Sequence, residues 1–146
     1  MHLSQAKYIS NLLQKTNMLH VKSVPTPMVS NQSLSNFGSA SFSNTQLYRS
    51  IVGALQYATI TSPNITYSVN QVCQFMQTPL TAHWKVIKRI LRYLVGTLHH
   101  GLHLQRWRSN SYLNLTGFYD ADRVSDVDDR HSTSRYYLFL GPNLVS

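Results

Sequence analysis

The carboxylate side chains that could bind a metal ion lie in one short stretch near the end of this 146-residue chain. All are aspartates, since the sequence contains no glutamate: they are Asp120, Asp122, Asp126, Asp128 and Asp129. Their spacing is similar to that of a calcium-binding loop, but Ser125 stands at its sixth position, normally glycine, and His131 at its twelfth, normally glutamate. A two-ion magnesium site, in which the octahedral ions lie about 4 Å apart, is also not readily formed by a single loop. We therefore expect Asp126, Asp128 and Asp129 to form a solvated turn.

Four cationic side chains share one face of an amphipathic helix expected over residues 81–95. They are Lys85, Lys88, Arg89 and Arg92, and at 3.6 residues per turn they fall within roughly 100° of one another. The apolar residues of the same helix recur on its other side: Trp84, Ile87, Ile90, Leu91 and Leu94. Of the 13 Lys and Arg residues, ten precede position 120, and no acidic side chain does. This imbalance favours a polyanionic partner such as nucleic acid; the alternative is an ordinary solvated helix face.

Histidine and cysteine give weaker signals. His99, His100 and His103 lie close together in the sequence, but no fourth ligand is evident, so a surface strand that carries histidines is preferred over a metal site. Cys73 is the only cysteine, so neither a disulfide nor a cysteine-based zinc site can form within one chain. We interpret Cys73 as a small residue on an apolar helix face.

Helical periodicity fills most of the first hundred residues. Helices are expected at about residues 4–18, 45–58, 62–77 and 81–95. The third begins at Ser62-Pro63, a serine cap followed by proline at the first helical position. For the fourth, Thr81 is the expected N-cap and Gly96 the expected left-handed C-cap. The short connections between the last three helices predict a compact bundle.

The remaining stretches lack this periodicity. Residues 20–46 contain Pro25-Thr26-Pro27 and then a run rich in Ser, Asn and Gly, which predicts a flexible linker or a long surface loop. After Gly96 the pattern alternates, and short strands are expected at 102–104, 113–119 and 136–140. The expected fold class is therefore α+β, a helical bundle followed by an incomplete antiparallel β-meander.

Several stretches closely resemble the Pol polyprotein of copia-type retrotransposons, especially those of plants. The matching words are LSQAKYISNLL (3–13), VPTPM (24–28), LYRSIVGALQY (47–57), SPNITYSVN (62–70), HWKVIKRILRYLVGTLHHGL (83–102), GFYDAD (117–122), DDRHSTS (128–134) and FLG (139–141). The resemblance covers nearly the whole chain, except the loop at 29–44. It implies the C-terminal end of the reverse transcriptase, followed by the start of the RNase H domain.

The resemblance also implies a division of the chain and a role for one aspartate. Residues 1–19 would end the reverse transcriptase region, 20–46 form a Pro/Ser/Asn-rich linker, 47–105 form the helical thumb or connection region, and 106–146 supply the first strands of an RNase H-like domain. Asp120 takes the position of the first RNase H carboxylate, which binds Mg²⁺ in the parent enzyme. Asp122 is expected to be a neighbour rather than a ligand.

We expect a truncated fragment of Pol without catalytic activity and without a bound cofactor. The polymerase aspartates of the family and the later RNase H carboxylates are missing from this sequence. Two alternatives are open: weak, non-specific binding of an RNA–DNA hybrid or duplex by the four cations, or an interaction with the remainder of Pol. Arg123 and Arg135 stand where the family usually has tryptophan and glycine, which suggests a decayed copy. The sequence has no secretory signal and no apolar run that could span a membrane, so we expect an intracellular location.

Overall fold

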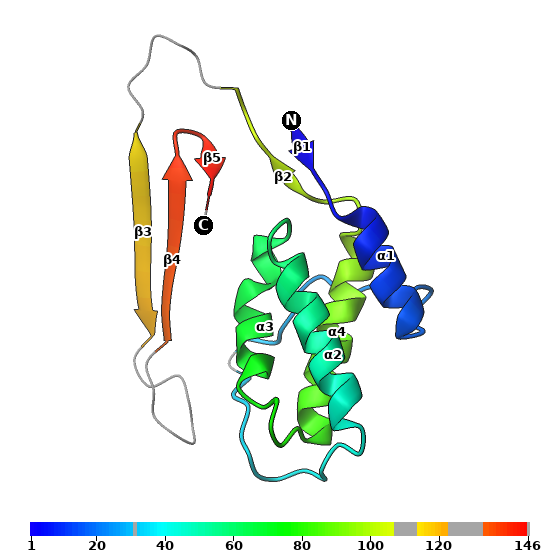
Figure 1. Ribbon diagram of the computed structural model, residues 1–146. Helices are drawn as coiled ribbons and strands as arrows, with labels where there is room; N and C mark the ends of the chain where they lie inside the picture. The colour runs from blue at the N-terminus through cyan, green and yellow to red at the C-terminus, as the bar shows by residue number, and fades with distance from the viewer. Residues whose placement is uncertain (31, 107–113, 123–132, 146) are drawn as a thin grey trace.

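The computed structural model describes residues 1–30, 32–106, 114–122 and 133–145. Its elements are β1 (His2–Leu3), α1 (Ala6–Lys15), α2 (Thr45–Ala58), the 3₁₀ turn η1 (Pro63–Ile65), α3 (Thr66–Cys73), α4 (Thr81–Gly96), β2 (Leu102–His103), β3 (Leu115–Asp122), β4 (Thr133–Leu140) and β5 (Asn143–Leu144). The four helices form one group, and the sheet β3-β4-β5 stands beside it (Figure 1). The α+β fold class expected from the sequence is confirmed.

The apolar stripes of all four helices meet in one buried core. Its members include Ile9 and Leu13 of α1, Tyr48, Ile51 and Leu55 of α2, Val69 and Val72 of α3, and Ile87, Ile90, Leu91 and Leu94 of α4. Ile87, Ile90, Leu91 and Leu94 are residues whose helical spacing marked them as inward-facing, so the periodicity identified this part of the core correctly; Trp84 is only partly buried. The first helix shares this core, because Ile9 and Leu13 are fully buried in it.

The helix boundaries differ from the expected ones mainly in their caps. Asn44 caps α2, and its side chain accepts a hydrogen bond from the Leu47 backbone N–H at 2.9 Å. Ser62 precedes η1, as expected, but its hydroxyl makes no capping hydrogen bond. The expected N-cap of α4, Thr81, is its first helical residue, because Leu80 takes the extended conformation of the cap. The expectation for Thr81 was therefore wrong.

The expected left-handed cap at Gly96 is also wrong. Gly96 is the last residue of α4, Thr97 is the C-cap with φ −119°, and positive φ among the described glycines occurs at Gly38 and Gly141 instead. A different constraint acts at this position. A Cβ on Gly96 would lie 3.0 Å from the Cβ of Ser23, so the glycine allows another segment to approach the helix closely.

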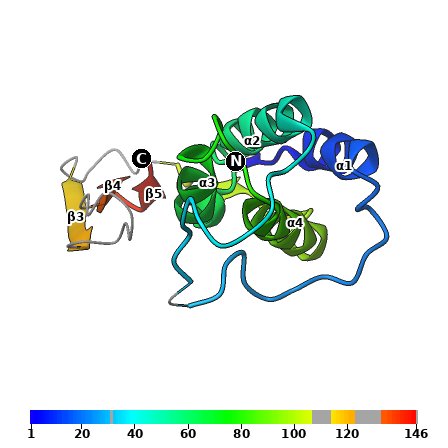
Figure 2. The same cartoon turned by 90° about the horizontal axis from the view of Figure 1, so that it is seen from below.

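That segment is the irregular chain between α1 and α2, called the strap below (residues 20–44). At the N-terminal end of α4, Ala40 O accepts from Thr81 N at 2.9 Å, and the ring of Phe42 stacks on Trp84 with centroids 4.7 Å apart. Ser23 lies against Gly96 at the other end. In its described residues, 20–30 and 32–44, the strap has no helix, as expected for a surface loop, but these contacts hold it against both ends of α4. Figure 2 shows its path from α1 past α4 to α2.

Two short strands join the ends of the helical group. His2 pairs with His103 and Leu3 with Leu102, both in antiparallel register. A Cβ on Gly101 would lie 2.1 Å from the carbonyl oxygen of Leu3, so this approach requires glycine. The strand at 102–104 was expected from the sequence, whereas β1 was not.

The larger sheet is an antiparallel meander. In the ladder between β3 and β4, Leu115 lies opposite Leu140 and Asp122 opposite Thr133; β5 then pairs with the end of β4 after a turn at Gly141, whose φ is 58°. β3 is longer than expected and continues through Asp120. Gln105 and Asn143 link the chain after β2 to β5 by two hydrogen bonds, of 2.7 and 3.0 Å.

Large apolar side chains remain exposed on this sheet. Phe118 is 60% exposed, Tyr119 70%, Tyr136 58% and Tyr137 47%. Directly opposed residues project to the same face, so Tyr119 and Tyr136 belong to one face and Phe118 and Tyr137 to the other. Both faces therefore carry aromatic side chains without a packing layer over them in the described chain.

Candidate nucleic-acid interface

The cationic face of α4 divides into two unlike pairs. Lys85 and Lys88 are exposed, whereas Arg89 and Arg92 are partly buried. The residues between the lysines, Val86 and Ile87, are buried in the core. The core packing of α4 therefore turns the lysine pair towards solvent, as the sequence predicted.

The arginine pair is engaged by the strap. Arg92 Nε donates to Lys22 O at 2.8 Å, and Arg89 Nη2 donates to Thr26 Oγ1 at 2.9 Å. The Nε of Arg89 is buried and has no hydrogen-bond partner in the described part of the chain. The planar guanidinium, with its fixed fork of donors, suits such contacts better than an ammonium group does. These arginines hold the strap on α4, a role that the sequence did not indicate.

The strap adds a further cation that sequence spacing could not place. The Lys22 side chain is exposed, and the carbonyl of the same residue is the acceptor for Arg92. Lys22 thus lies at the C-terminal part of the cationic face, although 70 positions separate it from Arg92. No side-chain anion precedes Asp120, so this part of the chain offers these cations no carboxylate partner. The surface is therefore positively charged.

His83 is a structural residue of this helix that the sequence analysis did not single out. It is fully buried, its ring stacks on Phe75 with centroids 3.9 Å apart, and its Nδ1 accepts a hydrogen bond from Leu80 N at 3.0 Å. Nε2 must then carry the proton and donate to Ser35 O, 2.9 Å away. His83 therefore caps the start of α4 and ties the strap to it. Its spacing four residues before Ile87 was the available signal.

The carboxylates do not form a metal centre in the described part of the chain. Asp120 and Asp122 both lie on β3, where the ladder pairs Asp120 with Arg135. Asp126, Asp128 and Asp129 lie outside the described residues. Within the described ranges, no group of three or more His, Cys, Asp or Glu residues could hold a metal ion. The two aspartates of β3 alone supply too few ligands for the two-ion site of an RNase H.

Cys73 and Tyr48 belong to the core. Burial raises the pKa of the Cys73 thiol, which a hydrogen bond with Gln56 partly offsets. The Tyr48 hydroxyl donates to Val72 O at 2.8 Å, and burial raises its pKa well above the ordinary value. A nucleophilic cysteine needs the opposite shift, so the interpretation of Cys73 as a packing residue fits its surroundings.

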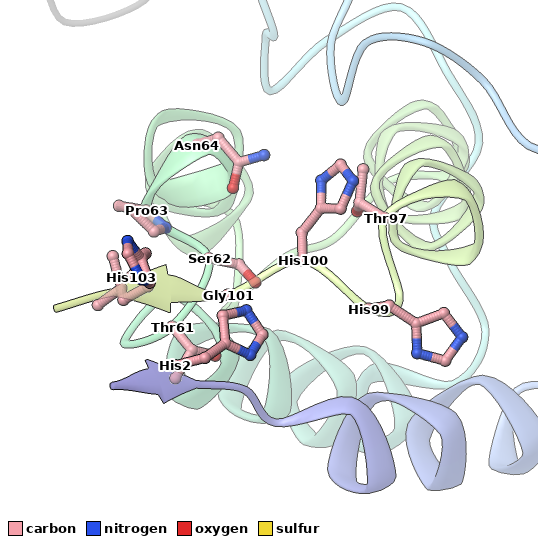
Figure 3. Close-up of a pocket in the computed structure, with 11 residues that line it drawn as sticks. His2, Thr61, Ser62, Pro63, Asn64, Thr97, His99, His100, Gly101 and His103 are labelled. Atoms are coloured by element: carbon pink, nitrogen blue, oxygen red, sulfur yellow. The ribbon is translucent and has the colours of Figure 1, made fainter.

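Histidines meet at a pocket of about 490 Å³ at the C-terminal end of α4 (Figure 3). His99, His100 and His103 line it, as does His2 of β1. The remaining lining residues are Thr61, Ser62, Pro63, Asn64, Thr97, Gly101 and Leu102. The sequence placed three of these histidines near one another but could not bring His2 to them.

Comparison with known proteins gives strong matches over the full chain. It is 43% identical over 146 residues to the retrovirus-related Pol polyprotein from transposon RE1 of Arabidopsis thaliana, which covers 100% of this chain and 10% of that polyprotein. An uncharacterized mitochondrial protein of the same plant is 43% identical to the chain. The match covers 99% of this chain and 58% of that protein. The corresponding polyprotein from transposon TNT 1-94 of Nicotiana tabacum is 34% identical over 151 residues, covering 99% and 11%.

The chain thus spans about a tenth of the length of the curated Pol polyproteins that it matches. No protein-family model matches it, and no solved structure does. In the described part of the chain, no helix has the length and apolar character needed to cross a membrane.

Proposed function

The chain belongs to the retrovirus-related Pol polyproteins of copia-type plant transposons, and we propose that its α4 face binds the phosphate backbone of a nucleic-acid duplex without reading sequence. The duplex would be an RNA–DNA hybrid or DNA. In this proposal the 146 residues contribute binding to the parent polyprotein and have no catalytic activity of their own.

The exposure of Lys85 and Lys88 on a core-anchored helix carries the proposal. Both ammonium groups stand on one side of a rigid element, and Lys22 lies near the far end of the same face. Cations spaced along a helix can neutralise successive phosphates without contacting bases. The absence of acidic side chains before Asp120 leaves their field uncompensated locally.

The hydrogen bonds of the arginines lower the expected affinity. Four independent cations would give a logarithmic salt slope of about −3 to −4, whereas two or three give about −2 to −3. Arg89 and Arg92 would have to release Thr26 and Lys22 to contact phosphates with the same donors. We expect weak binding at low salt that is largely lost near physiological salt.

A charge-matched pair of variants tests this. Fluorescence anisotropy with a short labelled hybrid should show that Lys85→Gln/Lys88→Gln flattens the salt slope by about 2. Lys7→Gln/Lys15→Gln removes the same charge from exposed lysines of α1 and should change the slope by less than about 1. Equal effects of the two double variants would mean that only net charge matters and that α4 is not the interface.

We further propose that β3-β4-β5 corresponds to the first strands of an RNase H-like domain, with Asp120 at its first carboxylate position. The GFYDAD word lies on β3 at the start of an antiparallel meander, and aromatic residues project from both faces of the ladder. A sheet that is apolar on both sides is typical of a domain in which both faces are covered. An experimental structure of the corresponding polyprotein region in which β3 is an uncovered edge strand would refute this assignment.

Assays of primer extension and of hybrid cleavage test whether the chain lacks catalytic activity. Purified protein with Mg²⁺ or Mn²⁺ should neither extend a primer nor cleave the RNA of a hybrid, because the described carboxylates assemble no multi-ligand metal site. Metal-dependent cleavage that disappears in Asp120→Asn would contradict the proposal.

An interaction with the remainder of Pol is the second candidate. The exposed rings of Phe118, Tyr119 and Tyr136 favour it, because aromatic residues gather at protein interfaces. Co-purification with the full polyprotein after nuclease treatment would support it, and loss of the interaction with nuclease would assign the association to nucleic acid.

A further inference from the structure

The pocket at the end of α4 brings together segments that are distant in the sequence. His2 comes from β1, Thr61 and Ser62 from the turn before η1, and His100 from the turn between α4 and β2. Figure 3 shows the Ser62 hydroxyl beside Gly101, with the imidazole of His2 on one side of this segment and that of His100 on the other, whereas the ring of His99 points away. The close contact of Gly101 with Leu3 fixes the position of β1, and with it that of His2.

Two hydroxyl groups on this pocket are not used by the fold. Ser62 makes no capping hydrogen bond although it stands at a cap position. Thr61 is 8% exposed, and its Oγ1 is buried without a hydrogen-bond partner among the residues that the structure describes. A buried hydroxyl without a partner costs about 1–3 kcal/mol of stability. A ligand with acceptor atoms would give the Ser62 hydroxyl the partner that the cap does not supply.

The charge around the pocket selects the type of ligand. None of its lining residues is acidic, and no side-chain anion occurs before position 120. An imidazole in either neutral tautomer has one N–H donor, and a hydroxyl has another. Histidine clusters also suggest metal, but no group of three suitable ligands comes together in the described ranges. The pocket therefore presents hydrogen-bond donors and no acidic side chain among its lining residues, which suits a tetrahedral oxyanion.

We propose that this pocket binds a phosphate group, with His2, Ser62 and His100 as its main donors. A phosphate offers acceptor oxygens in several directions, so it can accept from donors on more than one of these segments. The volume of about 490 Å³ exceeds that of a single phosphate and leaves room for the organic part of a phosphate ester such as a nucleotide. This site is separate from the lysine pair of α4, and it does not depend on the proposed duplex binding.

Nuclear magnetic resonance of the ¹⁵N-labelled imidazoles of the whole chain tests the proposal. Titration with inorganic phosphate at constant ionic strength should shift the resonances of His2 and His100 saturably, with a dissociation constant of about 1–10 mM. Ser62→Ala and His100→Gln should each weaken binding by about fivefold or more. His20→Gln removes an exposed histidine outside the pocket and should leave the constant unchanged.

Two further measurements distinguish a nucleotide from inorganic phosphate as the ligand, and the pocket from the lysine pair of α4 as the binding site. Adenosine monophosphate binding more tightly than inorganic phosphate would assign the pocket to a nucleotide, and equal constants would assign it to the phosphate alone. The Lys85→Gln/Lys88→Gln variant should bind phosphate as the parent does. Shifts that are not saturable, equal weakening in His20→Gln, or saturable shifts with Zn²⁺ and none with phosphate would each overturn the proposal. Unchanged binding in Ser62→Ala and in His100→Gln, each with core methyl resonances retained, would overturn it as well.

Discussion

His83 shows how much of this fold depends on one buried polar side chain. Its two ring nitrogens connect Leu80 and Ser35, so the helix start and the strap share one residue. We expect His83→Phe to lower the free energy of unfolding by about 2–4 kcal/mol, because both backbone groups lose their bond to the ring in a buried setting. Urea denaturation followed by circular dichroism measures this. His20→Phe, at an exposed position, should change the stability by less than about 0.5 kcal/mol; equal midpoints for the two variants would contradict this role.

Because Tyr48 and Cys73 are packed in or against the core, we expect the protein to lose stability at alkaline pH. Burial raises the pKa of both groups, so the folded state favours their neutral forms. Their contribution is fully present below the unfolded pKa values, about 8.5 for cysteine and about 10 for tyrosine, and is lost as the pH rises through the higher folded values. Unfolding free energies should therefore be flat from about pH 6 to 8 and fall above it.

Single substitutions separate the two groups. Cys73→Ala should move the onset of the fall to about pH 10, and Tyr48→Phe should remove the steeper part beyond it. Tyr48→Phe also removes the bond to Val72 O, which costs about 1 kcal/mol at every pH. An alkaline fall of the same size in the double variant would mean that other groups cause it.

At the scale of elements, the contact between the strap and α4 is the least expected feature. Gly→Ala inside a helix normally stabilises it by up to about 1 kcal/mol. At Gly96 the added methyl would lie 3.0 Å from the Ser23 Cβ and 3.4 Å from its hydroxyl oxygen. We therefore expect Gly96→Ala to be neutral or destabilising alone, and stabilising in a Ser23→Gly background.

A double-mutant cycle measures this coupling. Thermal unfolding of the parent, both single variants and the double variant should give a coupling energy above about 0.5 kcal/mol. Additive changes in the free energy of unfolding would show that the strap accommodates the added methyl group without loss of stability.

The sequence predicted the helices and their buried faces because helical periodicity records directly which residues point inward. It also identified Lys85 and Lys88 as exposed, since they lie opposite the apolar stripe of α4. The roles of Arg89 and Arg92 could not be derived in this way, because their partners are more than 60 positions away. Gly96 was misjudged for a related reason: glycine at a helix end serves both left-handed caps and close approaches, and spacing does not separate the two.

The candidate sites likewise depend on contacts between segments that are distant in the sequence. The histidines at 99, 100 and 103 are neighbours in sequence, whereas His2 reaches them only through a two-residue strand that has no periodic signature. Ser62 was identified as a cap, but its unused hydroxyl becomes apparent only when η1 replaces the expected first turn of α3. Local patterns therefore gave the elements, and the long-range contacts that build the sites did not follow from them.

At the scale of the whole molecule, the helical group and the large sheet differ in how they are supported. The helices share one buried core, whereas the sheet exposes Phe118, Tyr119 and Tyr136. We expect the amides of β3 and β4 to exchange with solvent faster than those of α2 and α4, because opening the sheet exposes little additional apolar area. Native-state hydrogen exchange read by mass spectrometry tests this, and equal, strong protection in both parts would indicate that another layer, such as a second copy, covers the sheet.

The pairing of β1 with β2 has a consequence for the order in which the molecule forms during synthesis. His2 meets His103, so this pairing closes a loop of about one hundred residues. Closing so long a loop costs conformational entropy before the contacts that offset it are made. Such contacts therefore form late in folding. During synthesis, β1 leaves the ribosome about one hundred positions before β2, so its pairing partner becomes available only after α4 has been made. The histidine pocket, which needs both strands, would then be among the last parts to assemble, and an unfinished chain would lack it although most of its helices could already have formed.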